Sequence, residues 1–187
     1  MHVKHANETM PPIDLIRGRI SYDPITGALH WKHCGPDGFK DHRGWRIWLG
    51  KFAGHEIKKR CRGYVVIAFS VDGVTRYMQG HRVVWALMTG EWPTHEIDHV
   101  NGIRLDNRWG NLRAATHAEN QRNKSTSCRN KSGVKGVHRH TQNGTWVAQI
   151  KVQGQRTKYL GSFQTIELAA EAYRKACVEL HKDFARV

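Results

Sequence analysis

The chain has 187 residues, with 30 lysines and arginines against 16 aspartates and glutamates, so its formal net charge is +14 and its pI is about 10.0. This length accommodates one or two domains with small cores and excludes a single large core. So large an excess of positive charge costs self-repulsion and indicates a polyanionic partner.

Two further features of the sequence indicate in which cellular compartment the protein is expected. No apolar run approaches the ~18 residues of a membrane span, and the first residues lack the apolar stretch of a secretory signal. The cysteines are scattered and form no C-x-x-C pair, so neither a zinc knuckle nor a disulfide framework is predicted. We therefore expect reduced thiols and a protein of the cytoplasm or nucleoid that contacts no membrane. The cysteines are Cys34, Cys61, Cys128 and Cys177.

The N-terminal part is predicted to be a loose arm followed by β-rich structure. Residues 1–12 are polar and end in Pro-Pro, and the pattern becomes β-like from Ile13. Residues 19–22 and 28–31 flank a turn that contains Pro24 and Gly27, which predicts a hairpin. Residues 35–54 are rich in glycine and charge around Trp45 and Trp48. That segment is either a loop anchored by its aromatic side chains or a DNA-facing surface.

A second hairpin and a helix are predicted next. Residues 64–69 form a strongly apolar strand, and the chain turns at residues 71–74 into a partner strand at 75–78. Apolar residues then follow helical spacing from His81 to Thr89, and Gly90 ends the helix.

In the central stretch, residues 97–120, a local turn and a helix cap are predicted to bring polar side chains together. A short strand places Asp98 beside His99, and the Asn-Gly pair that follows is a strong turn signal. A looped return reaches Asn111. A helix then opens at Thr116, where Thr-x-x-Glu forms a capping box and places Asn120 in the first helical turn.

These residue types suit metal-assisted hydrolysis. Asp98 and Asn120 offer the hard oxygen ligands that Mg²⁺ or Mn²⁺ prefers, and two ligands leave positions for water and a phosphate oxygen. His99, neutral near pH 7, is the candidate general base. Asn111 has an amide oxygen that can accept from the imidazole N–H and hold the useful tautomer.

The order Asp-His, Asn-Leu-Arg, Thr-x-x-Glu-Asn resembles the ββα-metal site of HNH nucleases, in the phage and homing-endonuclease branch where asparagine replaces the last histidine. The resemblance implies that His99 is the general base, that Asn111 is the central asparagine, and that Asp98 and Asn120 bind one divalent ion. The lead-in around residues 63–65 and 81–85 is also similar to that of phage HNH proteins. His81 and His117 are further candidate site contacts.

An alternative overlaps this site. Residues 95–99 match H-E-x-x-H, the pattern of zinc proteases, in which both histidines lie on one face of a helix. Pro93 just before and Asn101-Gly102 just after leave room for barely two helical turns, and no third ligand follows at a familiar spacing.

The remaining chain is predicted to be a basic linker and a small second domain. Residues 122–133 are polar and basic and can follow a DNA backbone. Residues 136–139, 145–152 and 156–160 predict three strands, with turns at Asn143-Gly144 and Gln153-Gly154. Residues 165–179 predict a helix. Its apolar stripe is Leu168, Ala169, Ala172, Tyr173 and Ala176.

This pattern resembles the plant ethylene-response-factor DNA-binding domain, a three-stranded sheet on one helix that binds the major groove. The matching segments are residues 136–137, 146–150, 160–163 and 169–173. The resemblance implies that Trp146, Gln149, Lys151 and Tyr159 face DNA. His138, Gln149, Lys151 and Thr157 depart from that family's arginine- and glutamate-rich reading face. The full set of expected DNA contacts is Arg113, Arg122, Lys124, Arg139, Trp146, Gln149, Lys151, Lys158 and Tyr159.

The expected fold class is α+β: a ββα-metal nuclease core with a β-rich lead-in at 13–121, a linker at 122–133, and a three-stranded antiparallel sheet packed on one helix at 134–187. The expected function is a DNA endonuclease that uses one Mg²⁺ or Mn²⁺ ion, of the homing type and nicking, which acts on double-stranded DNA as a monomer without a small-molecule cofactor. Its compartment is then the cytoplasm of a bacterial host. The alternative is a non-catalytic DNA-binding regulator with a degenerate nuclease fold.

Overall fold

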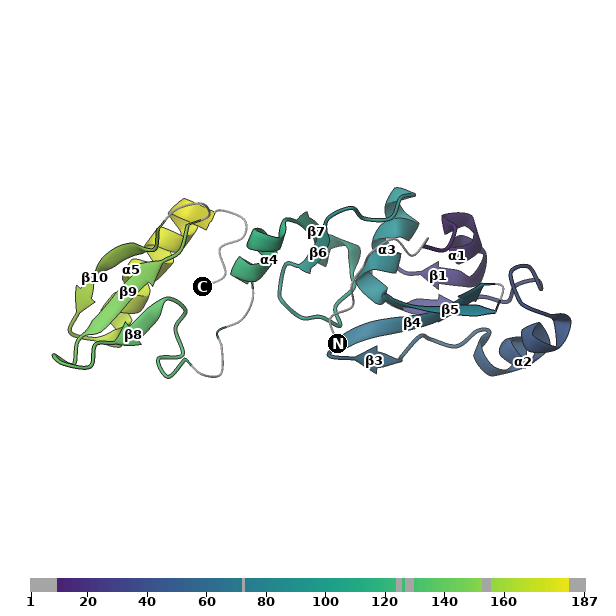
Figure 1. The fold of residues 1–187 in the computed structure, drawn as a ribbon, viewed down its shortest axis with the longest axis horizontal. Coiled ribbons are helices and arrows are strands. Elements are labelled where there is room, and N and C mark those ends of the chain that lie inside the picture. The colour runs from purple at the N-terminus through teal and green to yellow at the C-terminus, as the bar shows by residue number, and fades with distance from the viewer. Residues whose placement is uncertain (1–9, 72, 124–125, 127–129, 153–155, 182–187) are drawn as a thin grey trace. The chain divides into compact units, whose positions relative to one another are not determined.

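The computed structural model describes residues 10–71, 73–123, 126, 130–152 and 156–181 (Figure 1). Helices and strands are mixed, and the contacts divide the chain into two compact units, Met1–Ala114 and Ala115–Val187. This division assigns helix α4 to the second unit. The domain limits expected from the sequence, at residues 121–122 and 133–134, stay a prediction, and residues 1–9 of the expected arm lie outside the described residues.

The first unit contains three helices, a 3-10 turn and a series of short antiparallel strands among its described residues. In chain order they are α1 (Ile13–Arg19), β1 (Ile20–Tyr22), β2 (Leu29–Trp31), α2 (His42–Phe52), β3 (Arg60–Cys61), β4 (Tyr64–Val71), β5 (Val74–Gln79), α3 (Gly80–Thr89), β6 (Glu96–His99), the turn η1 (Trp109–Asn111) and β7 (Leu112–Ala115).

Both predicted hairpins of this unit are confirmed. β1 pairs with β2, and the turn between them is closed by Asp23, whose carboxylate accepts from the backbone N–H of Ile25 and the hydroxyl of Thr26. β4 pairs with β5 over six residue pairs. The predicted helix that follows is α3, and it ends at Gly90, whose φ of 82° is the left-handed conformation that glycine adopts without strain.

Two helices of this unit were not predicted from the sequence. Residues 13–19 form α1 rather than the start of a β-like region. Residues 42–52 form α2 rather than a loop, because the carboxylate of Asp41 caps the helix by accepting from the N–H of Gly44 at 2.6 Å. Trp48, on α2, packs edge-on against Trp31 with ring centroids 5.3 Å apart. The lead-in is therefore mixed helix and strand.

The core of the first unit lies between α1, the β4–β5 hairpin and α3 (Figure 1). Ile16, Ile67, Phe69, Val83 and Val84 are among its most deeply buried apolar side chains, each at most 1% exposed. Arg19 is buried beside them, and its guanidinium donates to the carbonyls of neighbouring segments. This core supports β4 and α3, the two elements that carry the side chains around His99.

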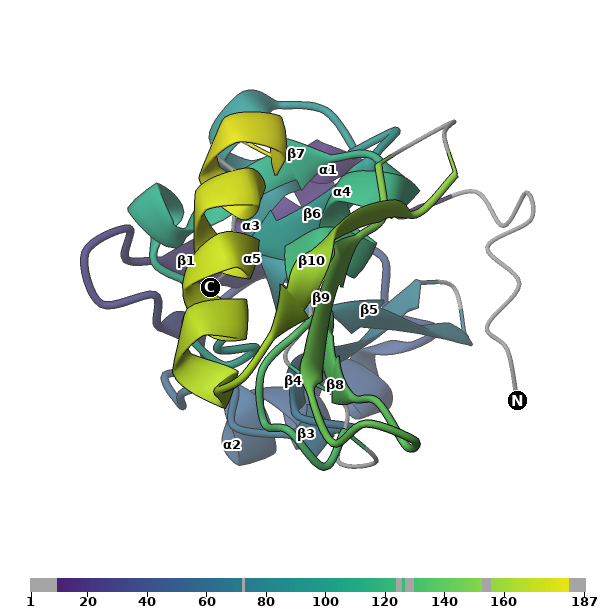
Figure 2. The same cartoon turned by 90° about the vertical axis from the view of Figure 1, so that its left-hand side faces the viewer.

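The second unit is a three-stranded antiparallel sheet with one helix on one of its faces, as predicted (Figure 2). Leu168 was expected in the apolar stripe of that helix but is 54% exposed, and the core consists of smaller side chains around Tyr173. The Gln153-Gly154 turn and Cys128 lie outside the described residues. The elements are α4 (His117–Asn123), β8 (Val137–Arg139), β9 (Trp146–Ile150), β10 (Lys158–Phe163) and α5 (Ile166–His181), and the strand order is β10-β9-β8.

Gly136 sets how closely the start of β8 approaches the rest of this unit. Its φ is +70°, and a Cβ atom there would lie 2.3 Å from the Tyr173 ring and 2.4 Å from the carbonyl oxygen of Gln149. Only glycine fits both the backbone conformation and the space.

None of the helices within the described ranges combines the length and apolarity needed to cross a bilayer.

Candidate active site

β6 and β7 pair to form the two-stranded ladder on which the candidate site is built. Asp98 and His99 end β6 and are 6% and 4% exposed. The predicted turn follows at once, because Gly102 takes a φ of +68° and donates its N–H to the carbonyl of His99 at 2.8 Å. Since residues 96–99 are a strand, His95 and His99 do not share a helical face. The zinc-protease alternative is therefore wrong.

The imidazole of His99 is held among polar and aromatic groups. Its Nε2 lies 3.2 Å from Oδ1 of Asn107, and its ring lies 5.0 Å from that of His81 and 6.1 Å from that of Tyr64, centroid to centroid. Burial lowers the pKa of His99, and the hydrogen bond to Asn107 and the charge of Asp98 oppose this shift only in part. The ring is therefore neutral near pH 7, the form that a general base requires.

Asn111 does not have the contact that we expected for it. Its Oδ1 accepts from the backbone N–H of Asn101, and its Nδ2 donates to the Asn101 side chain and to the carbonyl of Asp106. These bonds brace the loop between β6 and β7. Asn107, which is 2% exposed, supplies the carboxamide oxygen at the imidazole instead.

Asp98 is paired with an arginine from the neighbouring strand. Nε and Nη2 of Arg113 lie 3.0 and 2.9 Å from Oδ2 of Asp98. Arg113 was expected to contact DNA, but its side chain is only 18% exposed and is held in this ion pair. The pair compensates the cost of burying the carboxylate charge beside His99.

His81, a candidate site contact, does lie next to His99. It sits in the first turn of α3 and is 5% exposed, and its Nδ1 finds no hydrogen-bond partner in the described part of the chain. Burial, with help from the nearby His99 and Arg82, lowers the pKa of His81 to about 3. A neutral imidazole thus packs edge-on with the His99 ring.

Helix α4 carries the remaining expected ligand. The capping box is confirmed: the Glu119 carboxylate accepts from the N–H of Thr116 at 2.7 Å, and the Thr116 hydroxyl accepts from the N–H of Glu119 at 3.3 Å. Asn120 lies in the first turn of this helix, and His117 contacts Gln121 through Nε2 at 3.1 Å. Asp98 belongs to the first unit and Asn120 to the second, so their shared role stays a prediction.

The described residues contain no group of three or more histidines, cysteines, aspartates or glutamates that could hold a metal. The expected ligand set contains one carboxylate and one carboxamide, so it is not a group of this kind. Hard oxygen donors of this kind suit Mg²⁺ or Mn²⁺, whereas structural zinc prefers nitrogen and sulfur ligands.

The sheet of the second unit separates the expected DNA contacts into two faces. Tyr159 pairs with Gln149 across β10 and β9, and both are exposed on the face opposite α5. Trp146 was expected on this face, but it alternates to the other face and packs against the core cluster around Tyr173. Arg139 and Lys158 pair with Trp146 and Ile150, so their side chains also start from the α5 side, although both are exposed.

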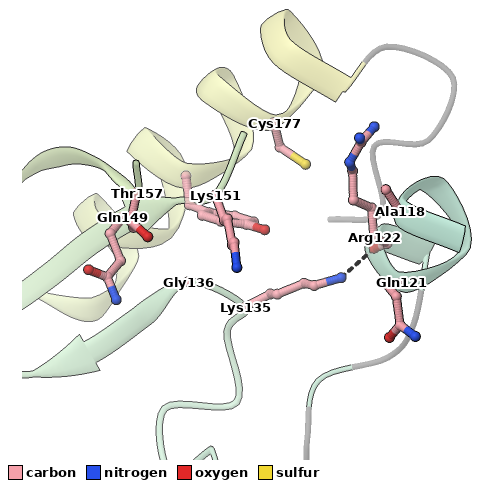
Figure 3. A pocket seen from close by; sticks show the side chains of 10 residues that line it. Ala118, Gln121, Arg122, Lys135, Gly136, Gln149, Lys151, Thr157 and Cys177 are labelled. Atoms are coloured by element: carbon pink, nitrogen blue, oxygen red, sulfur yellow. Dashed lines mark hydrogen bonds between the residues drawn. The ribbon is translucent and has the colours of Figure 1, made fainter. Parts of the chain in front are cut away.

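A cavity of about 600 Å³ in the second unit collects several of the basic residues (Figure 3). Arg122, Lys135 and Lys151 line it together with Gln149, and the Lys135 ammonium donates to the backbone carbonyl of Arg122. The part of its lining that the structure describes contains no aspartate or glutamate. Such a surface favours phosphate oxygens. Lys124 lies outside the described residues.

Three residues around His99 were missed in the sequence analysis. Asn107 contacts the imidazole from a loop position with no recurring pattern, and Tyr64 reaches it from β4. Tyr22, in turn, donates its hydroxyl proton to the carbonyl of Asn107 across 85 residues of sequence. No local pattern of the sequence indicates these long-range contacts.

Comparison with known proteins places the site in a family. A family model described as HNH endonuclease matches residues 79–122, which include α3, β6, β7 and most of α4. Protein 3.8 of Escherichia phage T7 is 34% identical over 107 residues, or 57% of this chain and 87% of that protein. An uncharacterized HNH endonuclease of Acanthamoeba polyphaga mimivirus, L560, is 34% identical over 110 residues, or 58% of this chain and 56% of that protein.

A second group of relatives is of plant origin. The AP2-like ethylene-responsive transcription factor PLT2 of Arabidopsis thaliana is 44% identical over 141 residues, which is 71% of this chain and 25% of that protein. These matches support the resemblance of the C-terminal segment to that DNA-binding domain. No solved structure matches the chain. With the phage protein covered almost throughout and the model matching the segment that carries Asp98, His99 and Asn111, the chain belongs to the HNH endonuclease family.

Proposed function

We propose that this protein is a divalent-metal-dependent DNA endonuclease of the homing type, which nicks double-stranded DNA as a monomer. The observation that carries the proposal is the neutral, buried His99 beside the carboxylate of Asp98, within the segment that matches the HNH family. A neutral imidazole next to an anionic oxygen ligand is what metal-assisted attack of water on a phosphodiester needs.

The proposed reaction begins with His99. The lone pair of its unprotonated ring nitrogen takes a proton from water, and the resulting hydroxide oxygen forms a bond to phosphorus as the bond from phosphorus to the leaving oxygen breaks. The charge of Asp98 and the Asn107 oxygen both favour the imidazolium that forms, because both raise the proton affinity of the ring. The leaving oxygen takes up a proton from solvent, and the imidazolium returns its own proton to solvent when the product leaves.

Asp98 and Asn120 are the proposed ligands of one Mg²⁺ or Mn²⁺ ion, and Asn111 braces the loop that follows Asp98. When bound, the ion stabilises the negative charge that develops on the phosphate and on the leaving oxygen. Arg113 already engages Oδ2 of Asp98, so this carboxylate must serve the guanidinium and the ion together. That sharing is consistent with weak metal binding.

The second unit is proposed to position the nuclease on its DNA. Gln149 and Tyr159, exposed on the sheet, and Lys151, exposed directly after β9, support this role, and the chain's net charge of +14 adds a sequence-independent attraction. A tethered DNA-binding module raises the effective concentration of the nuclease near its site. The affinity of this module should therefore fall as salt rises.

Supercoiled plasmid tests the proposal. Wild-type protein with Mg²⁺ or Mn²⁺ should give open circles before linear DNA, whereas a chelator or the His99→Ala variant should leave the plasmid supercoiled. The alternative is the DNA-binding regulator with a degenerate nuclease fold. If wild type and variant leave the plasmid equally untouched under every metal condition while both bind DNA, the regulator is the better description.

A further inference from the structure

The side chain of Asn107 is enclosed at the base of the site, although it belongs to an irregular loop. It is 2% exposed and among the most completely buried side chains of the described chain. A buried carboxamide oxygen needs a hydrogen-bond donor, so its place beside an imidazole determines which ring nitrogen carries the proton.

The contact with His99 is directional. Asn107 Oδ1 lies 3.2 Å from His99 Nε2, and Asn107 Nδ2 points toward Gly80, where a Cβ atom would lie 3.3 Å from it. An amide oxygen only accepts, so Nε2 carries the proton and Nδ1 is the basic nitrogen of the neutral ring.

The lead-in of the first unit holds Asn107 in this place. The hydroxyl of Tyr22 donates to its backbone carbonyl at 2.7 Å, and burial raises the pKa of Tyr22 to about 12, so the donor stays protonated. Gly27, with a φ of +78°, lies so close that a Cβ atom there would be 2.9 Å from the carbonyl carbon of Asn107 and 2.7 Å from the nitrogen of Arg108. The backbone N–H of Trp109 donates to the carbonyl of Pro24 at 3.1 Å.

We infer that Asn107 is the positioning residue that fixes the tautomer and orientation of His99, and that the β1–β2 hairpin exists in part to hold Asn107. This inference rests on the proposed role of His99 as general base. It assigns a second function to this hairpin, which also contributes Ile20, Leu29 and Trp31 to the core. Asn111 then has a separate task, because its carboxamide braces Asn101 and Asp106 and not the imidazole.

The tautomer of His99 can be measured without DNA or metal. Long-range ¹H–¹⁵N correlation spectra of the full chain at pH 8, with His99 assigned by the signals lost in His99→Ala, should show Nε2 protonated and Nδ1 bare. Asn107→Ala should shift His99 toward a mixture of tautomers. Asn107→Asp keeps an oxygen acceptor and should keep the Nε2–H form.

Asn101→Ala is the matched control, since it removes a carboxamide from the same loop that contacts Asp106 and Asn111. It should leave the His99 tautomer as in wild type. Tyr22→Phe loosens Asn107 without altering it, so a smaller shift in the same direction is expected. This variant also keeps the test usable if Asn107→Ala fails to fold.

Cleavage supplies the second readout. Asn107→Ala should lower the single-turnover rate by about 10- to 100-fold, the range typical of removing a partner that orients a functional histidine, and Asn107→Asp should recover part of it. A wild-type ring protonated at Nδ1, or an Asn107→Ala spectrum identical to wild type, would overturn the inference whatever the activity. A shifted tautomer in a chain that cleaves nothing would uphold the positioning role and reject the nuclease proposal.

Discussion

The burial of His81 predicts a stability that falls as the solution becomes acidic. The folded chain holds this imidazole neutral down to a pKa of about 3, whereas in the unfolded chain it takes up a proton near its ordinary value of 6.5. A depressed folded-state pKa means that protons bind the unfolded state first, so stability is complete above pH 6.5 and is lost as pH falls toward 3. One such group contributes a loss of about 2 kcal/mol between pH 8 and pH 5, with a limiting slope of about 1.4 kcal/mol per pH unit.

Urea unfolding followed by tryptophan fluorescence measures this loss of stability in the first unit, which contains His81. Six of the seven tryptophans lie in the first unit with His81, and only Trp146 lies in the second. His81→Gln removes the titrating ring, so the difference in unfolding free energy between wild type and variant should shrink by about 2 kcal/mol from pH 8 to pH 5.

His99 and the other histidines are common to both proteins, so the difference isolates His81. The control is His138→Gln, which changes an exposed histidine of the second unit and should leave the fluorescence-detected slope as in wild type. If the wild-type and His81→Gln curves run parallel from pH 8 to pH 5, His81 is not held neutral and the account of its burial beside His99 is refuted.

Three further predictions concern the second unit and its DNA. Gly136→Ala places a Cβ atom 2.3 Å from the Tyr173 ring at a residue with a left-handed backbone conformation, so it should destabilise the sheet by about 2 kcal/mol or more. Faster hydrogen exchange of the amides in β8 to β10 would show this loss, and unchanged exchange would contradict the packing described. Thr116→Ala removes the capping hydroxyl of α4 and should cost about 1 kcal/mol of local helix stability, which exchange of the α4 amides reports and which Thr116→Ser should largely restore. Lys151→Ala should weaken DNA binding and lower the slope of log affinity against log salt by about 1; an unchanged slope would remove Lys151 from the phosphate contacts.

Much of the fold followed from local chemistry. The turn after β1, the Gly90 helix end and the Thr116 capping box each depend on residues within a few positions of one another, and all were predicted. Helix α2 was missed because Gly44 and Gly50 lower its helix propensity, while the Asp41 cap and the contacts of Trp48 with Trp31 stabilise it in the folded chain.

The site was predictable in its composition and less so in its contacts. The neutral state of His99 follows from burial and was anticipated, but its carboxamide partner is Asn107 rather than Asn111, because the loop closes over Asn111 and turns Asn107 inward. The resemblance to a plant domain suggested that Trp146 faces DNA. Strand alternation puts Trp146 on the side of the buried Ala148 and Ile150, where it is partly buried against the same core.

The single-turnover cleavage rate of duplex DNA by wild type and by His99→Ala tests the central claim most directly. Protein in excess at matched DNA occupancy, with Mn²⁺ or Mg²⁺ added, removes differences in binding from the comparison. A general base of this kind contributes about 10²- to 10⁴-fold, so the variant should be slower by at least about 100-fold. Equal rates in the two proteins, at the same occupancy and metal concentration, would contradict the assignment of His99 and with it the proposed mechanism.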